Sequence, residues 1–244
     1  TTFDVLSGDT LTINSGITLT IPSGYTLNNA GAISNFGTIS NSGSVTITNT
    51  SGNGILNVSS GTITNNSGGS ITISSSSTSN GIAGGTITNS GTITITNTAG
   101  AGINTSGTIT NNSGGTITVS NSVSVIGNGI LIGSGGTISN SGSITISNTA
   151  GFGIAINSGG TITNNSGGII TISNSGTRGI FNTGTLTNNS GATITVSNTA
   201  NAGILNNSGI LINNFDDTLI NFEIFNNNLD GNFINSGGLT NLSG

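Results

Sequence analysis

The sequence predicts an all-β protein, a single-stranded parallel β-helix (β-solenoid) with about 25 residues and three short strands per rung. Three observations predict this fold. The chain nearly repeats itself along most of its length, the repeated words alternate Ile with Thr, and clusters of Asn, Ser and Gly separate them. Residues 107–121, which read GTITNNSGGTITVSN, contain all three features. We expect seven clear rungs and irregular ends.

The first repeated word follows a turn and reads SITISN, TITVSN or a close variant. Its leading aliphatic residues are separated by 26, 22, 24, 27, 26 and 24 residues, and Leu219 begins an eighth, degraded copy. Self-similarity at such a period is typical of solenoids, in which one unit cannot bury its apolar face alone. At ~4.8 Å per rung, seven to ten rungs give a rod roughly 35–50 Å long. The seven leading residues are Val45, Ile71, Ile93, Ile117, Ile144, Ile170 and Ile194.

A second word, GTITN or a variant, and a short Gly-Ile element complete each period. Period-two alternation, β-branched residues and flanking turn formers predict a strand for each word. Successive side chains of a strand point to opposite faces, so we expect Ile to point inward and Thr or Ser to point outward. The Gly-Ile elements begin at Gly54, Gly81, Gly102, Gly129, Gly153, Gly179 and Gly203.

Asn ends most copies of both words and marks the predicted corners of the rung. Asn tolerates left-handed backbone angles, and stacked Asn amides can form ladders along a β-stacking axis. We therefore interpret these residues as structural. They are Asn65, Asn89, Asn111, Asn140, Asn164, Asn188 and Asn213 after the second word, and Asn49, Asn97, Asn121, Asn148, Asn174 and Asn198 after the first.

The two ends of the chain differ from its centre. We divide the chain into an N-terminal lead-in or cap with short turns (1–40), a repeat body (41–213) and a C-terminal segment rich in Phe and Asp (214–244). The C-terminal segment holds Phe215, Phe222, Phe225 and Phe233 together with Asp216, Asp217, Glu223 and Asp230. Two interpretations stay open: a cap over the open strand edges, or an axial joint between subunits. The candidate assembly interface comprises Phe3, Asp4, Phe215, Phe222, Phe225 and Phe233.

Composition argues against several classes of function. Charged residues make up 3 % of the chain, and Arg178 is its one basic residue, so we expect no nucleic-acid partner. The chain has no Cys, His or Met, so we expect no disulfide, no metal site and no cofactor. No run is apolar enough to span a membrane. Asp216 and Asp217 are the one adjacent pair of carboxylates, without a basic neighbour, and we expect no enzyme. We expect Arg178 to be a solvated turn residue.

Outward Thr-x-Thr pairs are predicted on two faces of the rod. Such hydroxyl and methyl arrays resemble the ice-binding faces of solenoid antifreeze proteins, although Thr is also the favoured outward residue of an uncharged strand. Ser or Ile interrupts the arrays in places. One face carries Thr62/Thr64, Thr86/Thr88, Thr108/Thr110, Thr161/Thr163 and Thr185/Thr187, and the other carries Thr46/Thr48, Thr94/Thr96, Thr116/Thr118 and Thr193/Thr195.

The words GTITNNSGG and NSGSITISNT, with the opening ITLTIPSGYTL, resemble the low-complexity β-solenoid repeats of microbial surface proteins, namely filament and sheath subunits and adhesin stalks. The resemblance implies structural or adhesive material outside the cell and no catalytic residues. Our first hypothesis is a secreted structural subunit that self-assembles into an extracellular filament or sheath, with itself as partner. The alternatives are an ice-binding protein and a stalk segment of an adhesin or phage fibre. A processed form that has lost its signal peptide would explain the absence of Met, as would an engineered segment.

Overall fold

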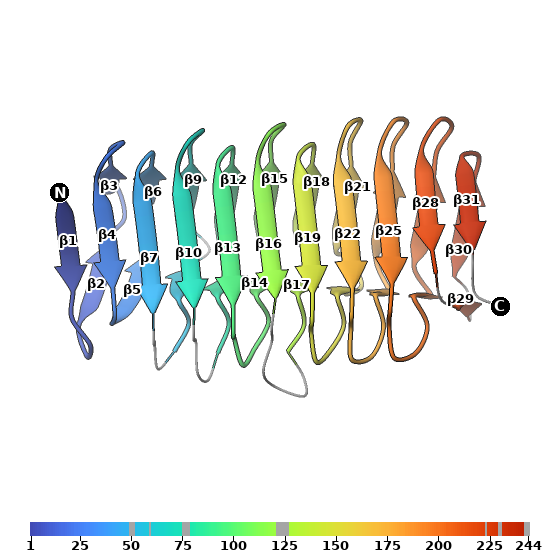
Figure 1. The fold of residues 1–244 in the computed structure, drawn as a ribbon, viewed down its shortest axis with the longest axis horizontal. Helices are drawn as coiled ribbons and strands as arrows, with labels where there is room; N and C mark the ends of the chain where they lie inside the picture. The colour runs from blue at the N-terminus through green and yellow to red at the C-terminus, as the bar shows by residue number, and fades with distance from the viewer. Residues whose placement is uncertain are drawn as a thin grey trace.

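The computed structural model of the chain describes residues 1–48, 52–58, 60–74, 79–120, 127–222, 224–228 and 231–241. The regular elements in these ranges are strands, which wind into three parallel sheets around one core (Figure 1). The two ends of the chain lie at opposite ends of the resulting rod. The predicted β-solenoid with three strands per rung is confirmed. None of the described residues forms a helix long and apolar enough to cross a lipid bilayer.

Each sheet takes every third strand of the chain, and we name the sheets A, B and C in chain order. Sheet A contains β1 (Thr2–Val5), β4 (Thr26–Asn29), β7 (Ser44–Thr48), β10 (Ser70–Ser74), β13 (Thr92–Thr96), β16 (Thr116–Ser120), β19 (Ser143–Ser147), β22 (Ile169–Ser173), β25 (Thr193–Ser197), β28 (Thr218–Asn221) and β31 (Gly238–Asn241). Sheet B contains β2 (Thr10–Ile13), β5 (Ala32–Asn35), β8 (Ile55–Asn57), β11 (Ile82–Ala83), β14 (Ile103–Thr105), β17 (Ile130–Ile132), β20 (Ile154–Ile156), β23 (Ile180–Asn182), β26 (Ile204–Asn207) and β29 (Phe225–Asn228). Sheet C contains β3 (Thr18–Ile21), β6 (Thr38–Asn41), β9 (Thr62–Asn65), β12 (Thr86–Asn89), β15 (Thr108–Asn111), β18 (Thr137–Asn140), β21 (Thr161–Asn164), β24 (Thr185–Asn188), β27 (Ile210–Asn213) and β30 (Asn232–Asn235).

The strand register follows the sequence repeat residue for residue. The leading aliphatic residues of the first word pair in sheet A in the predicted order, from Val45 with Ile71 to Ile170 with Ile194. Leu219 pairs with Ile194 as the expected eighth copy. The Gly-Ile elements supply the short strands of sheet B, and the second word supplies sheet C. The 11 strands of sheet A are separated by ten spacings of ~4.8 Å, which gives a rod about 48 Å long.

Both end segments extend the three sheets. Residues 1–40 contribute β1 to β5 and most of β6, four-residue strands joined by short turns. Residues 214–241 contribute β28 to β31, and the described part of this segment does not fold back across the end of the core. The lead-in and the C-terminal segment therefore build rungs in register with the repeat body.

The core is a stack of Ile side chains from all three sheets. Burial alternates along the strands, as in β13 (TITIT), where the two Ile residues are buried and the Thr residues lie at the surface. Removing one Ile side chain from water is worth roughly 1.5–3 kcal/mol. Inward Ile and outward Thr are confirmed, and each added rung enlarges the same core.

The Gly of each Gly-Ile element lies where the chain turns from sheet A into sheet B. A Cβ atom on Gly81 would lie 2.5 Å from Cγ2 of Ile95 and 2.6 Å from the carbonyl oxygen of Gly102. Both atoms belong to the next rung, so the close approach comes from stacking. Gly is required here because any side chain would push neighbouring rungs apart.

Gly81→Ala is expected to destabilise the rod by about 1–3 kcal/mol, the usual cost of overpacking a close-packed site. Gly52→Ala is the control, since a Cβ atom there meets nothing within 4 Å. Thermal unfolding followed by circular dichroism compares the two variants with the parent. Equal melting temperatures for all three would contradict the assigned contact.

Candidate functional surfaces of the rod

A continuous ladder of Asn side chains runs along the corner where sheet C turns into sheet A. The Nδ2 group of each residue donates to Oδ1 of the Asn one rung further on, at 2.8 Å in every step except the 3.1 Å step from Asn188 to Asn213. All members from Asn41 to Asn213 are fully buried. The predicted ladder is therefore confirmed. Its members are Asn41, Asn65, Asn89, Asn111, Asn140, Asn164, Asn188, Asn213 and Asn235.

The same amides also bind the backbone of the corner. Nδ2 of Asn111 donates to the carbonyl oxygen of Gly115 at 3.2 Å and to that of Ser143 in the next rung at 3.1 Å. A Cβ atom on Gly115 would lie 2.6 Å from Oδ1 of Asn111. The Gly that closes the NNSGG turn therefore leaves space for the ladder.

Asn residues after the first word have a different role. Asn97, Asn148, Asn174 and Asn198 have φ angles of 50–54°, in the left-handed region, and turn the chain out of sheet A. Asn49 and Asn121 lie outside the described residues. Sequence reasoning missed several shorter ladders, because they occur in only a few rungs. Those in the described residues include Asn35–Asn57 and Asn182–Asn206–Asn227 in sheet B, Asn221–Asn241 in sheet A, and Asn165–Asn189–Asn214 in the turns after sheet C.

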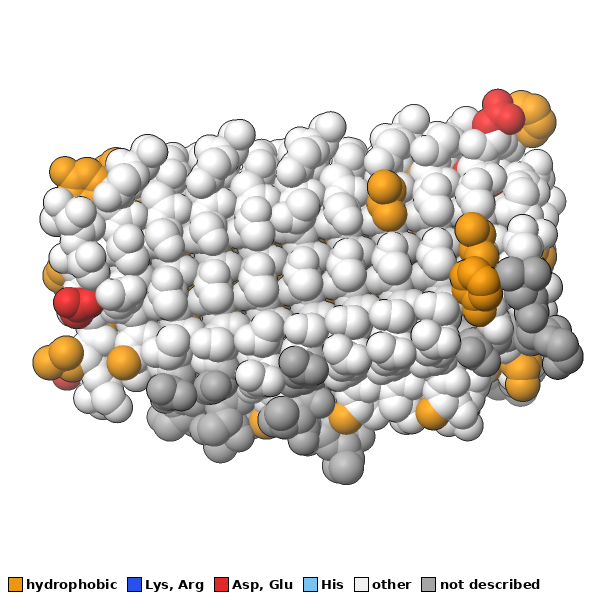
Figure 2. All heavy atoms as spheres, in the orientation of Figure 1, with side chains coloured by type: hydrophobic (Ala, Val, Ile, Leu, Met, Phe, Trp, Pro, Cys, Tyr) orange, Lys and Arg blue, Asp and Glu red, His pale blue; other side chains and the backbone are white. Residues whose placement is uncertain are grey.

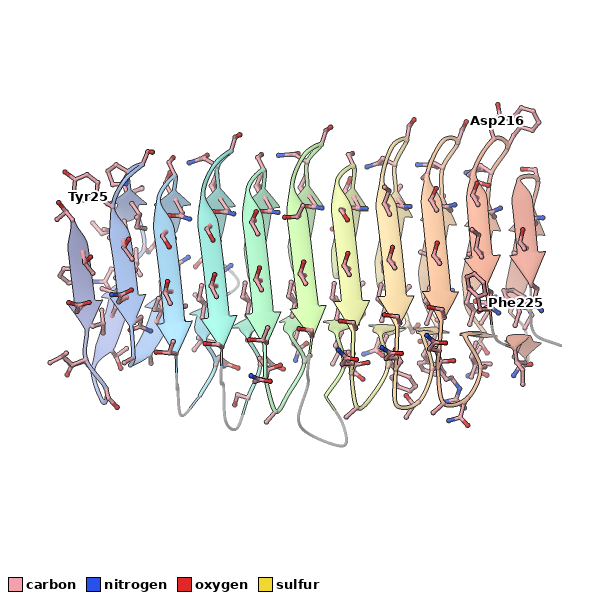
Figure 3. All side chains as sticks on the ribbon, in the orientation of Figure 1. Tyr25, Asp216 and Phe225 are labelled. Atoms are coloured by element: carbon pink, nitrogen blue, oxygen red, sulfur yellow. The ribbon has the colours of Figure 1, made fainter. Side chains whose placement is uncertain are left out.

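The predicted assembly residues lie at both ends of the rod. Phe3 faces the core at the N-terminal end, while Asp4 points outward and accepts a hydrogen bond from Nδ2 of Asn28 at 3.0 Å. At the other end, Phe225 and Phe233 face the core with ring centroids 4.8 Å apart. Figure 3 labels Phe225 at this end of the rod. The remaining two, Phe215 and Phe222, are exposed in turns of the last rungs.

Asp216 and Asp217 lie in the turn before β28, where most earlier rungs have Gly beside the Asn ladder. Asp217 occupies the place held by Ala192 one rung earlier and by Gly168 before that. It is 4 % exposed, and neither carboxylate oxygen has a hydrogen-bond partner. Burial raises the pKa of the Asp217 carboxyl, and backbone groups of Asn214 and of Asp217 itself oppose the rise only in part. Asp216 is exposed and left-handed, with φ 59°. Glu223 and Asp230 lie outside the described residues.

Outward residues align from rung to rung in both sheet A and sheet C, and the two sheets differ in how completely Thr fills their outward columns. In sheet A, Thr116 pairs with Thr92 and Thr118 pairs with Thr94, so the expected pairs Thr94/Thr96 and Thr116/Thr118 share only the middle of three outward columns. That middle column is Thr from Thr46 to Thr195, and the columns on either side mix Ser with Thr. In sheet C the two outward columns stay in register over eight rungs, β3 to β24. We call these columns the threonine lattice: Thr18, Thr38, Thr62, Thr86, Thr108, Thr137, Thr161 and Thr185 in one, and Thr20, Ser40, Thr64, Thr88, Thr110, Ser139, Thr163 and Thr187 in the other.

The sides of the rod are almost uncharged. Figure 2 shows the face of sheet A, where rows of uncharged polar side chains follow the rod and acidic side chains appear near its ends. Arg178, expected as a solvated turn residue, lies before β23, and its guanidinium is 5.9 Å from the ring centroid of Phe152. Phe152 in turn stacks on Phe181 at 5.1 Å. No group of three or more His, Cys, Asp or Glu that could hold a metal occurs among the residues that the structure describes.

Comparisons with known proteins add little to the functional interpretation of these surfaces. The sequence matches no protein-family model and no curated protein. Among solved structures, the chain is similar to the crystal structure of a TibA fragment whose hyper-glycosylation is catalysed by TibC. The identity is 19 % over 98 % of this chain and 97 % of that chain, with a TM-score of 0.22. A TM-score this low carries no argument about function.

Asn164→Ala is expected to destabilise the rod by about 1–3 kcal/mol for each buried group left without a partner. Asn164 accepts from Asn140 and donates to Asn188, both at 2.8 Å, whereas its neighbour Asn165 is partly exposed and binds Ser hydroxyls. Asn165→Ala is therefore the matched control. Chemical denaturation measures both variants, and an equal loss of stability would mean that the ladder has no special importance.

Asp217→Ala is expected to stabilise the rod at pH 7 by about 1–3 kcal/mol, because it removes a buried carboxylate without a partner. The pKa of Asp217 is raised in the folded state, so its cost is absent below the unfolded-state pKa and grows as pH rises through both values. The advantage of Ala should therefore shrink as the pH falls toward about 3, where only the smaller cost of burying a neutral carboxyl is left.

The control for this variant is Asp216→Asn, which removes an exposed charge and keeps a residue that tolerates the left-handed angle. Melting curves of the two variants and the parent between about pH 3 and pH 7 test the effect. A stability difference between Ala and Asp at position 217 that does not change with pH would contradict it.

Proposed function

We propose that the chain is a structural rod of an extracellular assembly and that copies join end to end through their terminal rungs. The observation that carries this proposal is the exposed apolar core at both ends. Phe3 occupies the same inward column as Leu27 but is 61 % exposed, against 3 % for Leu27. At the other end Leu239 is 37 % exposed, whereas Leu219, one rung inward, is fully buried.

The strand edges at both ends support the same arrangement. β1, β2 and β3 form the N-terminal edge of the sheets, and β29, β30 and β31 form the C-terminal edge. An edge strand presents unpaired N–H and C=O groups, which form a template for another parallel strand. Within the described residues no segment crosses either edge. A second copy is the partner whose strands repeat at the same spacing and register.

Each end also presents an apolar surface to such a contact. A hollow of about 120 Å³ opens at the N-terminal end, lined by residues that include Phe3, Leu19 and Tyr25. The C-terminal end presents the packed rings of Phe225 and Phe233, both only partly buried. In a head-to-tail contact the aromatic pair of one copy would cover the hollow of the next and remove both apolar surfaces from water.

Acidic residues lie at both ends of the rod, so we expect the salt concentration to control the end-to-end contact. Asp4 and Asp9 lie in the first rung and Asp216 and Asp217 near the last, while residues 10–215 carry Arg178 alone. The ends therefore repel each other at low salt. At 0.15 M ionic strength the screening length falls to about 8 Å, so we expect the joint to strengthen with salt.

A non-enzymatic role outside the cell is consistent with the composition. The chain has no Cys and no Met that oxidants could attack, and its one basic residue gives trypsin a single site. A stalk of an adhesin or phage fibre would use the same rod without the end-to-end contact, and that difference makes the two functions separable.

Phe3→Lys is expected to abolish end-to-end assembly, because it places a charge over the open core. The single rod should still fold, since Phe3 is already exposed in it. Leu56→Lys is the control, since Leu56 is 40 % exposed but lies on the side of the rod in sheet B. Electron microscopy and sedimentation velocity, over a range of concentrations at physiological salt, measure the assembly.

The parent and the Leu56 variant should form filaments with the ~4.8 Å axial repeat of stacked strands, and the Phe3 variant should remain as short rods. Short rods for the parent at every concentration and salt would overturn the joint and favour the stalk. Equal assembly of all three proteins would show that the contact lies elsewhere.

A further inference from the structure

The threonine lattice of sheet C has Thr in nearly every position of two neighbouring outward columns. One of its columns is Thr in all eight rungs, and the other has Thr in six rungs and Ser in two. Hydroxyl groups therefore repeat every ~4.8 Å along the rod and every ~6.6 Å along each strand. The lattice ends at β27, where Ile210 and Ile212 take the outward positions.

This lattice is also rigid. Thr is branched at Cβ and restricted at χ1, so its hydroxyl and methyl groups keep a fixed direction. The hydroxyl of Thr137 donates to that of Thr108 at 3.1 Å, which links two rungs at the surface. Behind them Ile109 and Ile138 are buried in the core, and the Asn ladder runs along the same strands. The hydroxyl groups are therefore already held in fixed positions in the free protein.

The chemistry of the lattice limits what can bind to it. No outward position of β3 to β24 carries a formal charge, so an ionic partner finds no counter-charge there. A folded protein of irregular surface could match only a few of the repeated positions. The complementary partner is neutral, periodic in two directions and able to form hydrogen bonds at every repeat.

We propose that the threonine lattice of sheet C binds the surface of ice. Water held between the methyl groups and bonded to the hydroxyl columns would adopt the spacing of the lattice and join the crystal. Sheet A provides the contrast, because Thr fills only its middle outward column, while the columns on either side mix Ser with Thr and one of them contains Ile169. This inference goes beyond the structural role, since it uses a side of the rod and leaves both ends free.

The test measures thermal hysteresis and ice recrystallisation with the full chain and two double variants. Thr88→Tyr with Thr110→Tyr places bulky rings in adjacent rungs of the lattice. Thr94→Tyr with Thr118→Tyr makes the same change in adjacent rungs of sheet A. Tyr is favoured in strands, and all four positions point outward and are partly exposed. Circular dichroism and melting curves confirm that both variants fold.

We expect the parent and the sheet A variant to arrest ice growth and the sheet C variant to lose that activity. Inactivity of the parent, or equal loss in both variants, would overturn the proposal, as would loss confined to the sheet A variant. If the Tyr variant of sheet C fails to fold, Thr110→Val keeps the shape and removes one hydroxyl. Full activity of that variant in a folded protein would equally count against hydroxyl binding.

A second copy of the chain is the competing occupant of the lattice, because two flat Thr faces could pack against each other. Sedimentation velocity in liquid buffer separates the two cases. Phe3→Lys is used as the background, so that end-to-end joining does not contribute. Side-by-side dimers that the Tyr substitutions of sheet C abolish, without any effect of the parent on ice, would replace ice with a second copy.

Discussion

The structure depends on one constraint: every rung must present its backbone groups in register with the rung before it. Parallel stacking pairs each strand with a strand one rung away, so an error at one corner would spread to all three sheets. The Asn ladder holds one corner in place, since each buried amide bonds to the next rung and to the backbone of its own turn. Because an unpaired buried amide is costly, the ladder favours one register over its neighbours.

The same constraint explains where the repeat can vary. Ladder partners are separated by 22 residues between Asn89 and Asn111 and by 29 residues between Asn111 and Asn140, yet both hydrogen bonds are 2.8 Å long. Differences in length are therefore absorbed by turns, such as the short Ser90-Gly91 and the longer NNSGG. The strands of sheet A from β7 to β25 and those of sheet C from β6 to β27 keep a constant length, because each must match the strand above and below.

Stacking also divides the surface into sides and ends with different chemistry. The sides repeat the outward residues of each strand and so become periodic, polar and nearly uncharged. The ends expose what every inner rung conceals, namely the strand edges and the inward apolar side chains such as Phe3 and Leu239. The two proposals therefore concern separate surfaces, and either one can fail without the other.

The sequence by itself determined the fold class, the three strands per rung, the inward Ile column and the Asn ladder. These features follow from local period-two patterns repeated along the chain, and the register from Val45 to Leu219 was readable because identical words must stack on identical words.

Only the tertiary structure decided what depends on contacts with another rung. It separated the buried Asn164 from the left-handed Asn174, and it showed that Thr116 stacks on Thr92. It also placed Asp217, without a partner, in a column of small residues. The physical reason is that burial and register at each position are set by residues more than 20 positions away, where divergent words give no local pattern to follow.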